Sequence, residues 1–157
     1  MASIPLTESE ADRLVAAPKS ITENLAWSYN PNEVWAKSEL RVINNLGVDL
    51  RVYANVNMKE PSLFTFALSL SRAFRVRGLC ANRGHVNKHT NREEWRPGTH
   101  KHRWTDRCRD RFAYTPVEEI SQDVAEAFRQ FCVECSISFE GQVQPLPPRQ
   151  IGLDEVP

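Results

Sequence analysis

Four histidines lie within one short stretch near the middle of the chain, at positions 85, 89, 100 and 102. On a β-strand, His100 and His102 would project from the same face about 7 Å apart, because alternate residues share a face. Two imidazoles so placed can ligate one metal ion. Without metal, one imidazole can remove a proton from a ribose 2′-hydroxyl while the other protonates the leaving 5′-oxygen. The pair therefore predicts phosphodiester chemistry, with or without a metal.

A third histidine precedes this pair in a polar stretch, residues 82–98, that is predicted to be a loop. If the loop folds back over the strand, His89 joins His100 and His102 as a third catalytic group. With Asp106 added, the same residues make a plausible ligand shell for a divalent metal ion. The residues alone leave metal-dependent and metal-free chemistry both open.

Positive charge surrounds the histidines although the whole chain has no net charge. Residues 72–111 hold twelve Lys or Arg and four Asp or Glu, a balance of +8, and the remainder of the chain carries −8. A local positive field attracts phosphate even on a neutral molecule. The residues predicted to contact nucleic acid are Arg83, Lys88, Lys101, Arg103 and Arg107. Ion pairing with the acidic flanks would explain the same charges without a ligand.

The chain has four cysteines, Cys80, Cys108, Cys132 and Cys135. The spacing of Cys132 and Cys135 is typical of metal-binding or redox pairs, and Cys80 and Cys108 could complete a zinc site. However, Cys132 falls in a segment with helical periodicity, where cysteine commonly packs as a small hydrophobe. We therefore expect buried thiols in preference to a zinc or redox site. A cysteine nucleophile at Cys80 or Cys108 has no supporting local motif.

The pattern of apolar residues predicts an α+β fold. Thr7 and Glu10 have the spacing of a capping box, which predicts a short N-terminal helix. A longer helix is predicted to begin near Pro116, with Thr115 as its N-cap. Alternating or β-rich segments predict strands at residues 40–43, 50–57, 63–70, 73–80, 99–114 and 137–139. We expect a curved antiparallel sheet of about five to six strands with a C-terminal packing helix and a short N-terminal helix.

The length of 157 residues fits one domain. We divide the chain into an N-terminal leader with a short helix at 1–22, a single α+β domain at 23–141, and a proline-rich tail, extended or disordered, at 142–157. No apolar stretch approaches the roughly 18 residues of a membrane helix. The N-terminus has neither the basic start nor the apolar run of a secretion signal. We therefore expect a cytoplasmic protein with no membrane partner.

Two short runs resemble small prokaryotic domains of uncharacterised families: Asn-Lys-His-Thr-Asn at 87–91 and Thr-His-Lys-His at 99–102. Those domains share a β-rich body, a polar loop with a His-Thr-Asn-like element and a later His-x-His strand. Some are predicted toxins of toxin–antitoxin or phage-defence loci. The resemblance spans residues 35–139 in general pattern. It implies a nucleic-acid-targeting activity for His89, His100 and His102.

Two functions follow from these observations, and the residues do not choose between an enzyme and a binding protein. The first is a nucleic-acid-directed phosphodiesterase, a ribonuclease-like toxin or antiviral defence component that uses the histidine cluster. The second is a non-catalytic regulatory module of a phage, defence or toxin–antitoxin system that binds RNA or an acidic partner protein. A small metal-binding domain with structural histidines is a third possibility.

Overall fold

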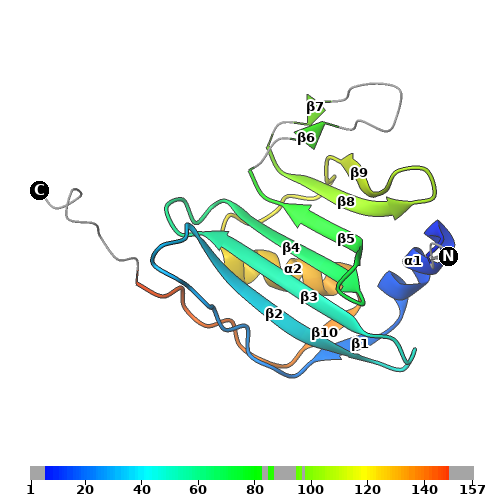
Figure 1. The fold of residues 1–157 in the computed structure, drawn as a ribbon, viewed down its shortest axis with the longest axis horizontal. Helices are drawn as coiled ribbons and strands as arrows, with labels where there is room; N and C mark the ends of the chain where they lie inside the picture. The colour runs from blue at the N-terminus through cyan, green and yellow to red at the C-terminus, as the bar shows by residue number, and fades with distance from the viewer. Residues whose placement is uncertain (1–5, 83–84, 87–94, 97, 149–157) are drawn as a thin grey trace, which may run out of the picture.

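An eight-stranded sheet forms the body of the computed structural model, which describes residues 6–82, 85–86, 95–96 and 98–148 (Figure 1). The strand order is β10-β1-β2-β3-β4-β5-β8-β9. The strands are β1 Lys19–Ile21, β2 Trp35–Asn44, β3 Leu50–Asn57, β4 Phe64–Leu70, β5 Phe74–Cys80, β8 His100–Thr105, β9 Arg109–Tyr114 and β10 Ile137–Phe139. A separate antiparallel pair joins β6 His85–Val86 to β7 Trp95–Arg96. The helices are α1 Glu8–Ala16 and α2 Val124–Glu134.

The α+β class and the two helices are confirmed, but the sheet has more strands than predicted. Residues 99–114 form a hairpin, β8 and β9, where one strand was expected, because a turn without glycine reverses the chain. Arg109 takes a left-handed conformation there, with φ of 55°. At the other edge β1 adds a strand that pairs in parallel with β10, so the sheet is mixed. A three-residue strand is too short to carry a recognisable alternating pattern.

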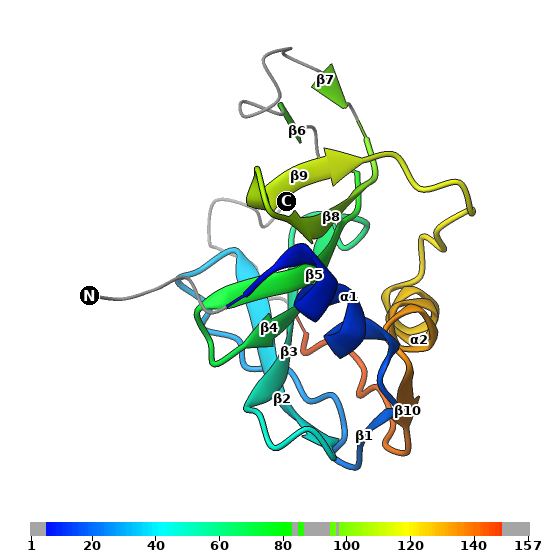
Figure 2. The ribbon, with the colours of Figure 1, turned by 90° about the vertical axis from the view of Figure 1, so that its right-hand side faces the viewer.

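The core lies between the sheet and α2. Alternate residues of β3 and β4 are buried, and the ring of Phe66 on β4 packs 5.4 Å from that of Phe128 and 5.7 Å from that of Phe131 on α2. The helix begins at Val124, eight residues later than predicted, because Asp123 is its N-cap and accepts a hydrogen bond from the Glu126 backbone N–H. Figure 2 shows α2 along one side of the sheet, and no described helix covers the other side of β2–β4.

Helix α1, in the predicted N-terminal leader, packs on the sheet. The predicted capping box of Thr7 and Glu10 is present, and α1 contacts β5 and β8. The buried ammonium of Lys19 donates hydrogen bonds to carbonyls in and just after the last turn of α1. Those carbonyls have no partner within the helix, so Lys19 fastens α1 to the sheet through β1. Neither described helix is long and apolar enough to span a bilayer.

The predicted tail is partly held by the domain. Val143 forms a parallel bridge with Leu25, and the indole N–H of Trp27 donates to the carbonyl of Gln144 over 3.0 Å. Residues 142–144 of the predicted tail therefore lie against the segment that precedes β2. The rest of the predicted tail, 149–157, lies outside the described residues.

Candidate metal centre

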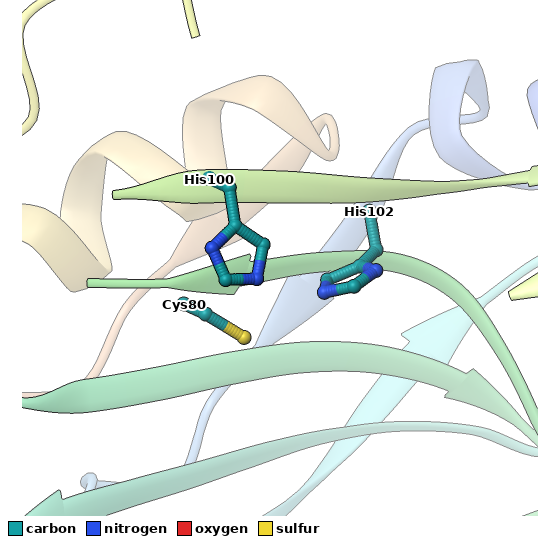
Figure 3. Close-up of side chains that lie close together, drawn as sticks. All are labelled: Cys80, His100 and His102. Carbon is teal, nitrogen blue, oxygen red and sulfur yellow. The ribbon is translucent and has the colours of Figure 1, made fainter. Parts of the chain in front are cut away.

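The pairing of β5 with β8 brings a thiol and two imidazoles together. In the antiparallel register Cys80 is opposite His100, and Gly78 is opposite His102. The candidate ligand atoms of Cys80, His100 and His102 all lie within 4.8 Å of one another (Figure 3). The two imidazole rings are 4.9 Å apart, centroid to centroid, with an interplanar angle of 74°. This is the one group of three or more candidate metal ligands found among the described residues.

The donor types match a transition metal better than Mg²⁺ or Ca²⁺. Thiolate and imidazole suit Zn²⁺ and related ions, whereas Mg²⁺ and Ca²⁺ take oxygen ligands. In a tetrahedral zinc site the ligand atoms are about 3.4–3.6 Å apart, given zinc–nitrogen and zinc–sulfur distances of about 2.1 and 2.3 Å. The candidate ligand atoms in the structure lie within 4.8 Å of one another, a limit roughly 1 Å longer than the separation between ligand atoms in such a site. Small side-chain rotations would therefore close the cluster around an ion without moving the strands.

The histidines are buried and one of them is oriented by the backbone. His100 is 2% exposed and His102 is 3% exposed, whereas Cys80 is half-buried. Nδ1 of His100 lies 3.3 Å from the carbonyl oxygen of Gly98. In the tautomer with hydrogen on Nδ1, this nitrogen donates to the carbonyl and Nε2 is the ligating atom. Metal-bound histidines commonly have such an outer hydrogen bond.

Gly78 leaves room beside the cluster for the positively charged side chain of Arg75. A Cβ atom at this position would lie 3.1 Å from Cδ of Arg75 and 3.5 Å from Cβ of His102. The absence of a side chain on Gly78 therefore lets Arg75 cross β5 next to His102. The guanidinium of Arg75 is held by the Asp110 carbonyl, to which Nη2 donates over 2.8 Å. A positive charge so placed favours anions near the cluster.

Lys101 lies on the opposite face of β8 from the two histidines. Its side chain is 7% exposed and forms ion pairs with Glu118 and with Glu134 of α2. Burial lowers the pKa of Lys101, but the hydrogen bonds to the two carboxylates outweigh it and raise the pKa overall. Arg77 also pairs with Glu134, over 3.1 Å. Lys101, which was predicted to contact nucleic acid, therefore lies in an ion-pair network beneath α2.

The other predicted site residues are dispersed. The guanidinium of Arg103 lies 5.4 Å from the ring centre of Phe112, and Arg107 is exposed in the turn between β8 and β9. Asp106 lies four residues beyond His102, about 13 Å along an extended chain, and accepts a hydrogen bond from the Glu8 backbone N–H. Asp106 is thus a cap of α1 and not part of the ligand cluster. The remaining predicted residues, Arg83, Lys88 and His89, lie outside the described residues.

The cysteines divide into one candidate ligand and three buried thiols. Cys108, Cys132 and Cys135 are buried, in agreement with the prediction. Burial raises the pKa of Cys132 to about 12 and also raises that of Cys135, so these thiols stay protonated and unreactive. Sequence reasoning missed the link between Cys80 and the histidines. Cys80 ends one predicted strand and His100 begins another, but only the β5–β8 register makes them neighbours.

A family model described as Family of unknown function (DUF6978) matches residues 6–137. The matched range begins just before α1 and contains all three residues of the cluster. It agrees with the resemblance to domains of uncharacterised families and carries no statement of activity. No curated protein and no solved structure matches the chain.

Proposed function

This chain belongs to a family of unknown function, DUF6978, and from the chemistry of its own residues we propose that it is a metal-dependent, nucleic-acid-directed phosphodiesterase. Cys80, His100 and His102 would hold the metal ion. The observation that carries the proposal is the convergence of these three donors within 4.8 Å on neighbouring strands. Zn²⁺ is the best fit, because the donor set combines a thiol with two imidazoles.

Three protein ligands are the number that catalytic zinc sites use, with the fourth position left for water or substrate. A zinc ion so held would activate water for attack and polarise a phosphoryl oxygen. Arg75, beside His102, would attract the phosphate, and the half-buried side of the cluster at Cys80 is the side that a substrate could approach. His89 remains a proposed additional ligand or acid–base group on the basis of its sequence position.

The biological setting that we propose is a cytoplasmic ribonuclease-like toxin or phage-defence component. Its support is the resemblance of residues 87–91 and 99–102 to domains of that kind, together with the concentration of positive charge at residues 72–111. Such a protein would act on RNA and would be controlled by a partner, as toxins of paired systems are.

One observation favours a second function. His100 and His102 are almost completely buried, which is typical of structural metal sites and restricts access for a large substrate. In this alternative the metal ion ties β5 to β8, and the protein is a non-catalytic module that binds RNA or an acidic partner protein. The two functions share the same ligands and differ in whether the bound ion performs chemistry.

A cobalt titration tests the metal centre. Co²⁺ bound to one thiolate and two imidazoles gives intense thiolate-to-metal absorption and tetrahedral ligand-field bands. We expect both signals in the wild type and their loss in Cys80→Ser and in His100→Ala/His102→Ala. Cys132→Ala is the matched control, because its thiol is buried away from the cluster. Absence of Co²⁺ and Zn²⁺ binding by the folded wild type would overturn the metal centre.

An RNA-cleavage assay then separates the enzyme from the binding module. We expect the zinc-loaded wild type to cleave single-stranded RNA, and we expect cleavage to stop with a chelator or in His100→Ala/His102→Ala. Circular dichroism should show that the double variant remains folded. A wild type that binds zinc but cleaves neither RNA nor DNA would refute the phosphodiesterase and support the structural centre.

A further inference from the structure

A second basic site lies at the turn between β8 and β9, away from the histidine cluster along β8. A cavity there, which we call the turn pocket, is lined by Ala73, Phe74, Trp104, Arg107, Cys108, Arg109, Asp110 and Arg111. The turn places Arg107, Arg109 and Arg111 on its rim, and all three are exposed. The backbone N–H of Arg111 donates to the Cys108 carbonyl over 3.1 Å, which closes the turn.

The turn pocket has an excess of positive charge. Its lining holds three arginines against a single carboxylate, that of Asp110. In the part of the chain that the structure describes, no ion pair is formed by Arg107 or Arg109, whereas Arg51, Arg72 and Arg77 each pair with a glutamate. Two guanidiniums that are not neutralised by a described carboxylate are available to a ligand with negative charge.

Trp104, which lines the same pocket, carries a buried hydrogen-bond donor. Trp104 is 3% exposed, and its indole Nε1 has no hydrogen-bond partner among the described residues. A buried polar group without a partner costs about 1–3 kcal/mol. The indole can only donate, so the ligand that would satisfy it is an acceptor. Phe74 packs edge-on against this indole, with ring centres 5.8 Å apart, and holds it in place.

From these observations we propose that the turn pocket binds a phosphate group of single-stranded nucleic acid. Arginine guanidiniums make paired hydrogen bonds to phosphate oxygens, and an indole N–H can add another. Trp104 is two residues beyond His102 on β8, about 7 Å along the strand. One strand of nucleic acid can therefore contact both places. The inference rests on the proposed function for its substrate class and adds the subsite that holds the strand.

Fluorescence anisotropy with labelled single-stranded RNA and DNA decamers tests the turn pocket. The variants are Arg107→Gln/Arg109→Gln, which removes two charges, and Trp104→Phe, which removes the donor and keeps an aromatic ring. Arg129→Gln, an exposed arginine of α2, is the matched control. We expect the double variant to bind at least about tenfold more weakly. Its salt dependence should fall by about 0.7 in log–log slope, because the pocket is proposed to hold one phosphate and each phosphate that a protein neutralises on a single strand accounts for roughly 0.7.

A further variant separates binding from stability. Arg109→Gly removes a guanidinium and places glycine at a left-handed position, where glycine is favoured. It should weaken binding several-fold without lowering thermal stability. The pocket is overturned if the arginine variants bind as tightly as Arg129→Gln. It is also overturned if the wild type binds neither oligonucleotide, or prefers a polyglutamate peptide to both.

Cobalt binding by the same variants tests the turn pocket separately from the proposed metal centre. Every turn-pocket variant should retain the thiolate absorption of bound Co²⁺, because no pocket residue is a candidate ligand. Loss of oligonucleotide binding with the metal signal intact supports the pocket. If the wild type binds oligonucleotides through these arginines but cleaves none of them, the pocket stands and the phosphodiesterase falls.

Discussion

The two faces of β8 use neighbouring residues in opposite ways. On the face that points to α2, Lys101 is buried and paired with Glu118 and Glu134. On the other face, His100 and His102 are equally buried but lie beside the thiol of Cys80. Successive side chains of a strand point to opposite faces, so Lys101 is separated from His100 and His102 although it lies between them in the sequence.

The two faces show that basic residues close together in the sequence can have different roles in the fold. Where carboxylates converge on a cation, as they do on Lys101, the charge is neutralised within the fold and is not available to a ligand. Where a thiol and two imidazoles converge and no described carboxylate joins them, the side chains have the donor types that a transition-metal ion takes. We call the face of β8 that carries Lys101 the helix-side face and the face that carries His100 and His102 the histidine-side face. The following substitutions test the contrast between them.

The largest effect is expected for Cys80→Ser on the histidine-side face. Zinc affinity should fall by about a hundredfold or more, because the thiolate is the strongest donor of the three. Competition against a chromophoric chelator measures the affinity, with Cys132→Ala as the control. Wild-type affinity in Cys80→Ser would show that the cysteine does not bind the ion.

A change on the helix-side face should affect stability and leave metal binding intact. Lys101→Met should lower the free energy of unfolding by about 2 kcal/mol, less than the 3–5 kcal/mol of a fully broken buried pair, because Arg77 still pairs with Glu134. Urea denaturation measures this loss. Lys101→Met/Glu118→Gln should recover part of it, because it removes the carboxylate that loses its partner and keeps Glu134 for Arg77. A large change in zinc affinity would contradict the separation of the faces.

Gly78→Val should disturb the histidine-side face by steric crowding. The new side chain would reach Arg75 and His102, so we expect several-fold weaker zinc binding and a loss of about 1 kcal/mol of stability. Ala67→Val is the matched control, since Ala67 is the direct partner of Gly78 on β4. Equal zinc affinity in the two variants would show that the space over Gly78 is not needed.

The smallest effect is expected from acid titration of the helix-side network. The hydrogen bond from Lys101 lowers the pKa of Glu118 below its ordinary value of 4.5. This stabilisation is present above pH 4.5 and is lost as the pH falls through the lowered pKa. Glu118→Gln should therefore show a slightly weaker acid dependence than the wild type, by under about 0.5 kcal/mol, because Glu118 is half exposed. Identical pH profiles would exclude this contribution.

Local patterns predicted the elements that carry strong signals. The capping box of Thr7 and Glu10, the alternating strands β3 and β4 and the apolar stripe of α2 all follow from nearest neighbours in the chain. Strand β1 was not predicted because it depends on distant contacts with β2 and β10. The later start of α2 is set by its N-cap, Asp123, in place of the predicted Thr115.

The sequence by itself determined that His100 and His102 share a face, because strand geometry alone requires it. It also determined that positive charge gathers at residues 72–111. Only the tertiary structure decided that Cys80 joins the histidines, that Lys101 is neutralised and that Asp106 caps α1. These partners are separated by 17 to 98 positions in the chain. Sheet register and helix docking bring them together, and a single sequence does not encode either in a local pattern.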